Sequence, residues 1–329
     1  MAKARAIVKR RKAVRNIRKI TKTMQMIATA KFQKSLKRAV GTKPYTLKVR
    51  ELVRELAASV GNVEHPLLYR PTADTQTNRI ALVVITSNRG LAGAYNGSVL
   101  RRAGVFIREQ EAAGKTIDLY VAGKKGISYF KFQKRPMERR VEVRDVPTFH
   151  EAERFMDEMI HRFQAREIDG LYVAYMNFIS TGVQRPEVAT MLPLAGVEET
   201  LTTMARQTAE GEAQLAAGAL DAKRSGADLS VGGPGHLSPL HVETTYDFSP
   251  SAKELLDELL PLTVKTAFFQ TFLDATTSEH VSRMVAMKSA TDNADKMVKA
   301  LTMQYNRARQ SQITTELSEI MGGVEAMNK

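Results

Sequence analysis

The feature that most constrains this chain is a helical pattern near its C-terminus that meets no strong stop signal over some 70 residues. Ser249 is a suitable N-cap, with Pro250 at the first helical position, and Gly322–Gly323 supply the first stop. Pro261 is expected to bend this helix. At about 1.5 Å per residue it spans on the order of 110 Å, which is wider than a single globular core. Such a helix needs a partner along its length.

The N-terminal segment supplies that partner. Residues 3–57 read as one helix that ends before Gly61–Asn62, and Pro44 is expected to kink or interrupt it. Apolar or small residues recur along it at steps of three and four, which predicts a seam for one neighbouring helix. The predicted seam consists of Ala13, Ile17, Ile20, Met24 and Ile27. The two terminal helices are therefore expected to pair as an antiparallel coiled coil.

The middle of the chain has a different pattern, in which short apolar runs alternate with helical ones. Strands are expected at 79–87, 116–123, 141–146, 170–178 and 186–194, and helices at 95–113, 124–133 and 148–167. Thr148 and Glu151 form a capping box for the last of these helices. Strands that alternate with helices indicate a mostly parallel, Rossmann-like three-layer α/β domain.

The expected organisation has four segments: an N-terminal helix over 1–60, an α/β domain over 78–194, an insertion over 195–240 and a C-terminal helix over 249–325. The insertion is rich in Ala and Gly, holds six acidic against three basic residues, and ends in a loop-like stretch. It is interpreted either as a tolerated surface insertion or as a regulatory segment.

The basic charge is concentrated at one end of the chain. Residues 1–54 hold 18 Lys and Arg and one acidic residue, Glu51, whereas the net charge of the whole chain is +14. The acidic partner of this helix is nucleic acid, lipid or an acidic protein surface. Within it, however, residues 23–30 carry no charge on any side. A helix that is uncharged all round is usually enclosed all round.

Signals of catalysis and ligand binding are weak. The stretch "SNRGLAGAYNG" (87–97) lies between a strand and a helix, but it lacks the spacing of a phosphate-binding loop. The six histidines form no metal-ligand pattern, and the chain has no cysteine. No nucleophile–base constellation and no apolar run long enough to span a bilayer is present. We expect no catalytic, cofactor or metal site.

Four stretches, taken together, resemble one family, the gamma subunit of F-type ATP synthase. They are "IRKITKTMQMIATAKF" (17–32), "SNRGLAGAYN" (87–96), "SEHVSRMVAMKSATDNADKM" (278–297) and "YNRARQSQITTELSEIMGG" (305–323). The likeness runs in order over most of the chain outside 195–240. That insertion lies where photosynthetic members carry a regulatory segment. Without cysteine, a dithiol switch cannot operate in it.

The resemblance implies a central rotor shaft, not an enzyme, that couples transmembrane proton flow to ATP synthesis or hydrolysis on the beta subunits. Its partners would be the alpha3-beta3 head, the epsilon subunit and the ring of c subunits, at the cytoplasmic face of a bacterial membrane. By motif match, the resemblance places eight residues at contacts with the head or at coupling positions: Lys19, Lys22, Met24, Lys31, Arg283, Arg309, Gln310 and Thr314. A nucleic-acid or anionic-surface binding protein that uses residues 1–54 is the alternative.

Overall fold

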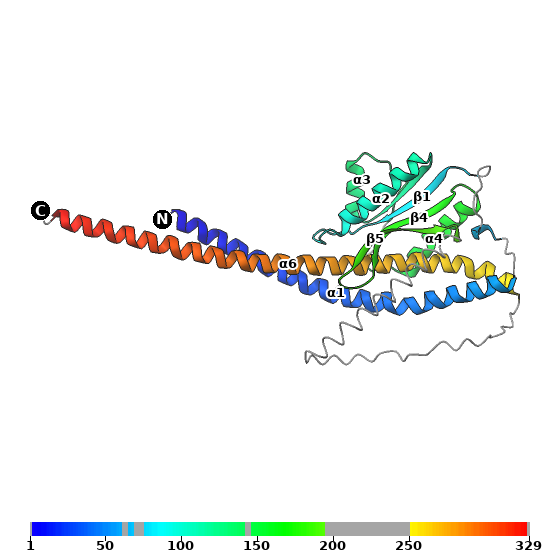
Figure 1. The fold of residues 1–329 in the computed structure, drawn as a ribbon, viewed down its shortest axis with the longest axis horizontal. Coiled ribbons are helices and arrows are strands. Elements are labelled where there is room, and N and C mark those ends of the chain that lie inside the picture. Colours follow the sequence, from blue (N-terminus) through cyan, green and yellow to red (C-terminus); the bar gives the residue numbers. More distant parts are fainter. Residues whose placement is uncertain (1, 61–64, 69–75, 142–145, 195–250, 328–329) are drawn as a thin grey trace, which may run out of the picture. The chain divides into compact units, whose positions relative to one another are not determined.

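The computed structural model describes residues 2–60, 65–68, 76–141, 146–194 and 251–327. They form two compact units (Figure 1). The coiled-coil unit contains residues up to 33, the short segment Leu91–Gly93, and residues from 280 onward. The sheet unit contains residues 34–90 and 94–279. The helices α1 (Ala2–Val60) and α6 (Ala252–Met327) each contribute to both units.

A five-stranded sheet, in the order β3-β2-β1-β4-β5, forms the centre of the sheet unit. Three of its strands are β1 (Arg79–Ile85), β2 (Thr116–Ala122) and β4 (Gly170–Phe178). β1 pairs in parallel with β2 and β4, and β2 pairs in parallel with β3 (Arg139–Val141). β5 (Gln184–Leu192) is antiparallel to β4. The sheet is mostly parallel, as predicted.

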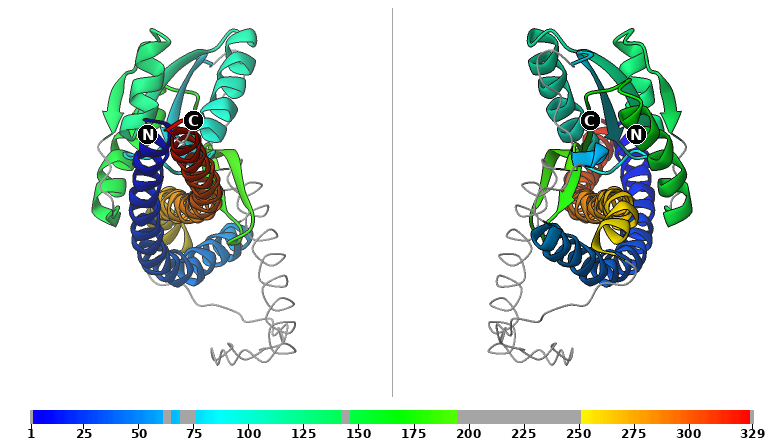
Figure 2. Two further views of the ribbon diagram at one scale, coloured as in Figure 1. Left: turned by 90° about the vertical axis from the view of Figure 1, so that its left-hand side faces the viewer. Right: turned by 90° about the vertical axis from the view of Figure 1, so that its right-hand side faces the viewer.

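Helices cover both faces of this sheet, so the predicted three layers are present. Alternate residues of β1, namely Ala81, Val83 and Ile85, share a buried cluster with α4 (Phe149–Gln164) and with α6 up to Ala275. The intervening residues of β1 are also buried, on the face where α2 (Tyr95–Ala112) packs. α3 (Lys124–Phe132) lies beside β2 (Figure 2). The first part of α6 thus completes the core of the sheet unit.

Several predicted element ends are confirmed and others are corrected. Thr148 and Glu151 form the capping box of α4. The third strand, expected over 141–146, is described over 139–141, and residues 142–145 lie outside the described part of the chain. The predicted cap Ser249 also lies outside it. The hydroxyl of Ser251 accepts the backbone N–H of Glu254 at the start of α6.

Prolines and glycines interrupt the long helices less than the sequence suggested. α1 continues as a helix through Pro44, and α6 continues through Pro261. α6 also passes Gly322 and Gly323 and ends at Met327, so the predicted stop was wrong. Glycine in a helix costs only about 1 kcal/mol relative to alanine, and two of them do not end an established helix.

The predicted fold class, a Rossmann-like α/β sheet with paired long helices, is confirmed. The helices are antiparallel in the coiled-coil unit, where Thr21 of α1 meets Thr291 of α6 and Arg11 lies over the ring of Tyr305. In the sheet unit, Gln270 of α6 donates to the backbone carbonyl of Ala39. The expected insertion at 195–240 lies outside the described residues. The four-segment division stays a prediction about domain organisation.

Candidate functional site

The surface of the coiled-coil unit is the candidate site, and the pairing of its two helices decides which side chains reach that surface. The described residues of α1 that are buried in this unit are Val14, Thr21, Ala28 and Phe32, which we call the inner seam. They are separated by seven, seven and four residues, the spacing of a heptad seam. On α6 they face buried Thr291, Ala294 and Leu301, with Val14, Ala294 and Leu301 in one cluster.

Polar contacts flank the inner seam and fix the register of the two helices. The hydroxyl of Thr291 donates to that of Thr21 over 2.8 Å, in a buried setting. Nearer the N-terminus, the guanidinium of Arg18 pairs with the carboxylate of Asp295, each about half exposed. Part of the positive charge of α1 is therefore paired with α6 at Arg18.

The seam predicted from the sequence was placed on the wrong side of α1. Its members, the outer stripe, are Ala13, Ile17, Ile20, Met24 and Ile27. Ile17 is 52%, Ile20 59% and Ile27 53% exposed, whereas Met24 is half-buried. Both stripes repeat at the same spacing, so periodicity alone could not choose between them. The side with the small Ala28 and the hydrogen-bonding Thr21 lies against α6, and the more apolar side faces outward.

The uncharged stretch 23–30 lies mainly on the outside of this pair. Ala28 is its one buried residue, and Met26 is 56% exposed. The hydroxyls of Thr23 and Thr29 donate to the backbone carbonyls of Lys19 and Gln25, at 3.0 and 2.9 Å. These turns therefore present methyl, thioether and alkyl groups, with their threonine hydroxyls already bonded within the helix.

The eight residues singled out by resemblance all belong to the coiled-coil unit. On α1, Lys19 and Lys22 are exposed, and Met24 and Lys31 are half-buried. The other four lie on α6. Arg283 is only 8% exposed, whereas Arg309, Gln310 and Thr314 are exposed. The burial of Arg283 places it inside the coiled-coil unit rather than on its surface. Sequence reasoning missed the exposure of Ile17 and Ile20, although their heptad spacing was visible.

The far end of α6 is exposed on all sides. From residue 313 to 324 every described side chain is exposed, including the large apolar ones. The hydroxyl of Thr314 donates to the backbone carbonyl of Gln310. The exposed apolar residues here are Ile313, Leu317, Ile320, Met321 and Val324.

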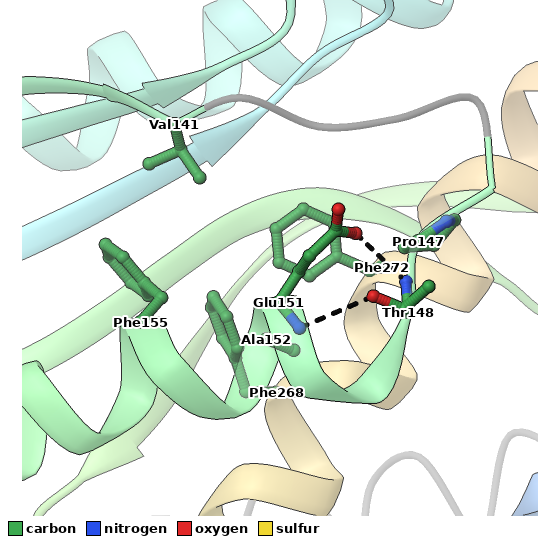
Figure 3. Close-up of a pocket in the computed structure, with 8 residues that line it drawn as sticks. All are labelled: Val141, Pro147, Thr148, Glu151, Ala152, Phe155, Phe268 and Phe272. Carbon is green, nitrogen blue, oxygen red and sulfur yellow. Dashed lines mark hydrogen bonds between the residues drawn. The ribbon is translucent and has the colours of Figure 1, made fainter.

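A small pocket lies between α4 and α6 in the sheet unit (Figure 3). Its lining is mostly apolar and includes Phe155, Phe268 and Phe272. The polar groups at its rim, Thr148 and Glu151, are engaged in the capping box. Its volume of about 20 Å³ has room for a water molecule but not for a substrate. In the part of the chain that the structure describes, no group of three His, Asp or Glu side chains is placed to hold a metal.

Comparison with known proteins agrees with this geometry. Residues 3–327 match the ATP synthase family. The ATP synthase gamma chain of Rhodopirellula baltica is 38% identical, covering 99% of both chains, and that of Leptospira biflexa is 35% identical over the whole of both. The chain belongs to the ATP synthase gamma chain family.

Solved structures share the fold. A chain of the Euglena gracilis mitochondrial ATP synthase, from its OSCP/F1/c-ring structure, aligns with a TM-score of 0.59 at 18% identity, covering 99% of this chain and 95% of that one. A chain from the Tetrahymena thermophila central stalk and c-ring aligns with a TM-score of 0.52 at 17% identity, covering 82% and 99%. None of the helices in the described residues is both long and apolar enough to cross a membrane.

Proposed function

We propose that this chain is the central rotor shaft of an ATP synthase. It couples transmembrane proton flow mechanically to ATP synthesis or hydrolysis on the beta subunits. Its partners are the alpha3-beta3 head, the epsilon subunit and the c-subunit ring. The observation that carries this proposal is the outer stripe: Ile17, Ile20 and Ile27 are exposed on the side of α1 away from α6, and apolar residues gathered there indicate a second partner.

The head supplies that second partner in our proposal. The outer stripe and the uncharged residues 23–30 would lie within its inner surface, where the shaft must turn. A fixed ion pair at this level would hold the shaft at one angle, and residues 23–30 have no charged side chain that could form one. Met24 is half-buried beside this surface, with Lys19, Lys22 and Lys31 near it along the helix. These lysines would meet acidic groups of the beta subunits.

The exposed end of α6 would reach deeper into the head. Ile313, Leu317 and Ile320 are each at least 49% exposed, and an isolated helix with such residues gains free energy when they are enclosed. Arg309 and Gln310 offer long donor side chains, which suit contacts that form and break at each step. Arg283 is buried, and we propose that it acts by holding the shaft together rather than by touching the head.

The chemistry of ATP belongs to the beta subunits in this proposal, and the gamma chain is a subunit without a catalytic site of its own. The complex places it on the cytoplasmic face of a bacterial cell membrane as a peripheral component. The bacterial relatives named above support that location. The alternative, binding of nucleic acid through residues 1–54, gains no support from these relatives.

Co-purification tests the proposal directly. A tagged chain, expressed with its neighbouring subunits, should be recovered with alpha and beta in a 1:3:3 ratio and should restore ATP-driven proton pumping to membranes that lack it. Recovery without alpha and beta at low salt, together with binding to nucleic acid that weakens steeply as salt rises, would favour the alternative.

A further inference from the structure

The chain passes between the two compact units at a place that the two long helices do not explain. α1 passes from one unit to the other after residue 33, and α6 after residue 279. A third crossing lies in the loop between β1 and α2. There Leu91–Gly93 belong to the coiled-coil unit, while the residues on either side belong to the sheet unit.

The tip of this loop lies against α6 within the coiled-coil unit. Ala92 is 2% exposed. Gly93 has φ of +56°, and a Cβ at this position would lie 3.6 Å from the Cβ of Ala286 and 3.8 Å from the backbone oxygen of Ser282. A Cβ at Gly93 would therefore be in ordinary van der Waals contact with α6, and a larger side chain would have to displace the loop from the helix.

The base of the loop is held rigidly in the sheet unit. The backbone N–H of Ser87 donates to the side-chain oxygen of Asn96 over 2.9 Å, and the amide of Asn96 donates back to the Ser87 hydroxyl over 2.8 Å. The backbone carbonyl of Ser87 accepts the backbone N–H of Lys125. The side-chain oxygen of Asn88 accepts the backbone N–H of Lys124. The loop is thus anchored to the first turns of α2 and α3.

We propose that Leu91–Gly93 form a latch that transmits torque between the shaft and the sheet unit. The proposal rests on the proposed rotor function. Two paired helices resist twisting about their common axis weakly, because torsion is spread along their length. A third attachment, tightly packed on α6 at Ser282 and Ala286 and anchored to the sheet, limits that twist. The latch stays closed during rotation and is a mechanical part of the coupling, not a ligand-binding loop.

A disulfide tests the contact in the full chain, which has no cysteine of its own. A Cβ–Cβ distance of 3.6 Å between residues 93 and 286 lies within the range that disulfides require. The pair Gly93→Cys with Ala286→Cys should therefore oxidise readily. The control pair Gly97→Cys with Ala286→Cys should not, because a Cβ at Gly97 has nothing within 4 Å. Failure of the first pair to form would overturn the contact without bearing on the rotor function.

Function is then measured in the assembled complex with the same cross-link. The proposal expects the same number of protons pumped per ATP hydrolysed before and after oxidation. Loss of pumping on oxidation, restored by a reductant, would show that the loop must release during rotation, and the closed latch would be wrong.

A wedge variant tests whether the contact matters. Gly93→Leu should retain ATP hydrolysis but lose pumping per ATP, because the side chain would force the loop away from α6. Gly114→Leu is the matched control, since Gly114 also has a positive φ, +78°, but a Cβ there has nothing within 4 Å. Equal pumping by the two variants would overturn the latch. If neither variant, nor the unmodified chain, assembled with alpha and beta, the rotor function itself would have failed instead.

Discussion

Thr291 of α6 donates a hydrogen bond to Thr21 of α1 over 2.8 Å, and both side chains are buried between the helices. The Thr21 hydroxyl in turn donates to the backbone carbonyl of Arg18 over 3.1 Å, and the carbonyl of Met287 lies 2.8 Å from the Thr291 hydroxyl. Each hydroxyl therefore has an acceptor in its own helix, in addition to its partner across the seam.

We expect Thr21→Val and Thr291→Val each to lower the free energy of unfolding by only about 1 kcal/mol, because the remaining hydroxyl turns to its own helix. The double variant should cost no more than either single one. Denaturant titration of the four proteins gives this comparison as a double-mutant cycle. A loss above about 3 kcal/mol in a single variant would mean that a hydroxyl is left without an acceptor.

The two stripes of α1 should respond oppositely to the same substitution. Val14→Gln places an amide in a buried cluster and should cost about 1–3 kcal/mol of stability, because Val14 is 6% exposed. Ile20→Gln should change stability by less than about 0.5 kcal/mol, yet reduce the yield of complex with alpha and beta. Thermal unfolding of the free chain and co-purification provide the two measurements. Normal assembly of the Ile20 variant would remove the outer stripe from the interface.

Met24→Lys should impair coupling while the chain still folds. The substitution places a cation in the uncharged turns, where an acidic group of the head could pair with it and hold the shaft. The readout is proton pumping per ATP hydrolysed in membrane vesicles, with Met24→Leu as the uncharged control. Full pumping by the lysine variant would contradict the need for a neutral surface at this level.

Arg162 should matter more to stability than Arg139, although both pair with carboxylates. Burial tends to lower the pKa of the Arg162 guanidinium, but hydrogen bonds to Asp118 and Glu167 raise it overall. The Asp118 side chain is 8% exposed, so Arg162→Met should cost about 3 kcal/mol. Arg139 and Glu158 are nearly half exposed, so Arg139→Met should cost at most about 1 kcal/mol. Equal losses in denaturant unfolding would contradict this ranking.

Stability should fall in acid because of His65. Burial lowers the pKa of this imidazole below its ordinary 6.5, and the nearby Asp257 only partly offsets the effect. Between the lowered value and 6.5 the unfolded chain binds more protons than the folded one, so the unfolding free energy decreases as pH falls through this window. Protonation would also break the bond from the Leu67 N–H to Nδ1.

In His65→Asn the side-chain oxygen can still accept the backbone N–H of Leu67, and the titrating imidazole is gone. Its denaturant midpoint should therefore depend less on pH between about 5 and 7 than that of the unmodified chain. An unaltered slope in the His65 variant would assign the acid sensitivity to other groups.

The pattern of apolar residues predicted the sheet, its helices and the pairing of the terminal helices, because burial imposes distinct periods on strands and helices. The pattern failed on α1, where the inner seam and the outer stripe have similar helical spacing. Ile17 and Ile20 have the spacing of a coiled-coil seam, but the partner helix prefers the side with Thr21 and Ala28. That choice depends on residues almost 270 positions away, and nothing local encodes it.

Local signals also misplaced the ends of α6. Ser249 and Ser251 are equally good caps by type, and Gly322–Gly323 look like a stop until the cooperativity of a long helix is considered. The loop contact between Gly93 and Ala286 was missed for a different reason. Its glycine lies in a stretch that the sequence placed between a strand and a helix, but a close approach to a distant helix leaves no periodic signal in the sequence.

The coiled-coil unit combines residues up to 33 with residues from 280 onward, so its two helices are synthesised at different times. Residues 1–33 leave the ribosome early, but their partner begins at residue 280. At 5–20 residues per second, roughly ten to fifty seconds pass before the inner seam has anything to pack against. During that time both stripes of the helix are open to solvent. The coiled-coil unit cannot form before α6 has been synthesised, and a chain cut short before α6 lacks it.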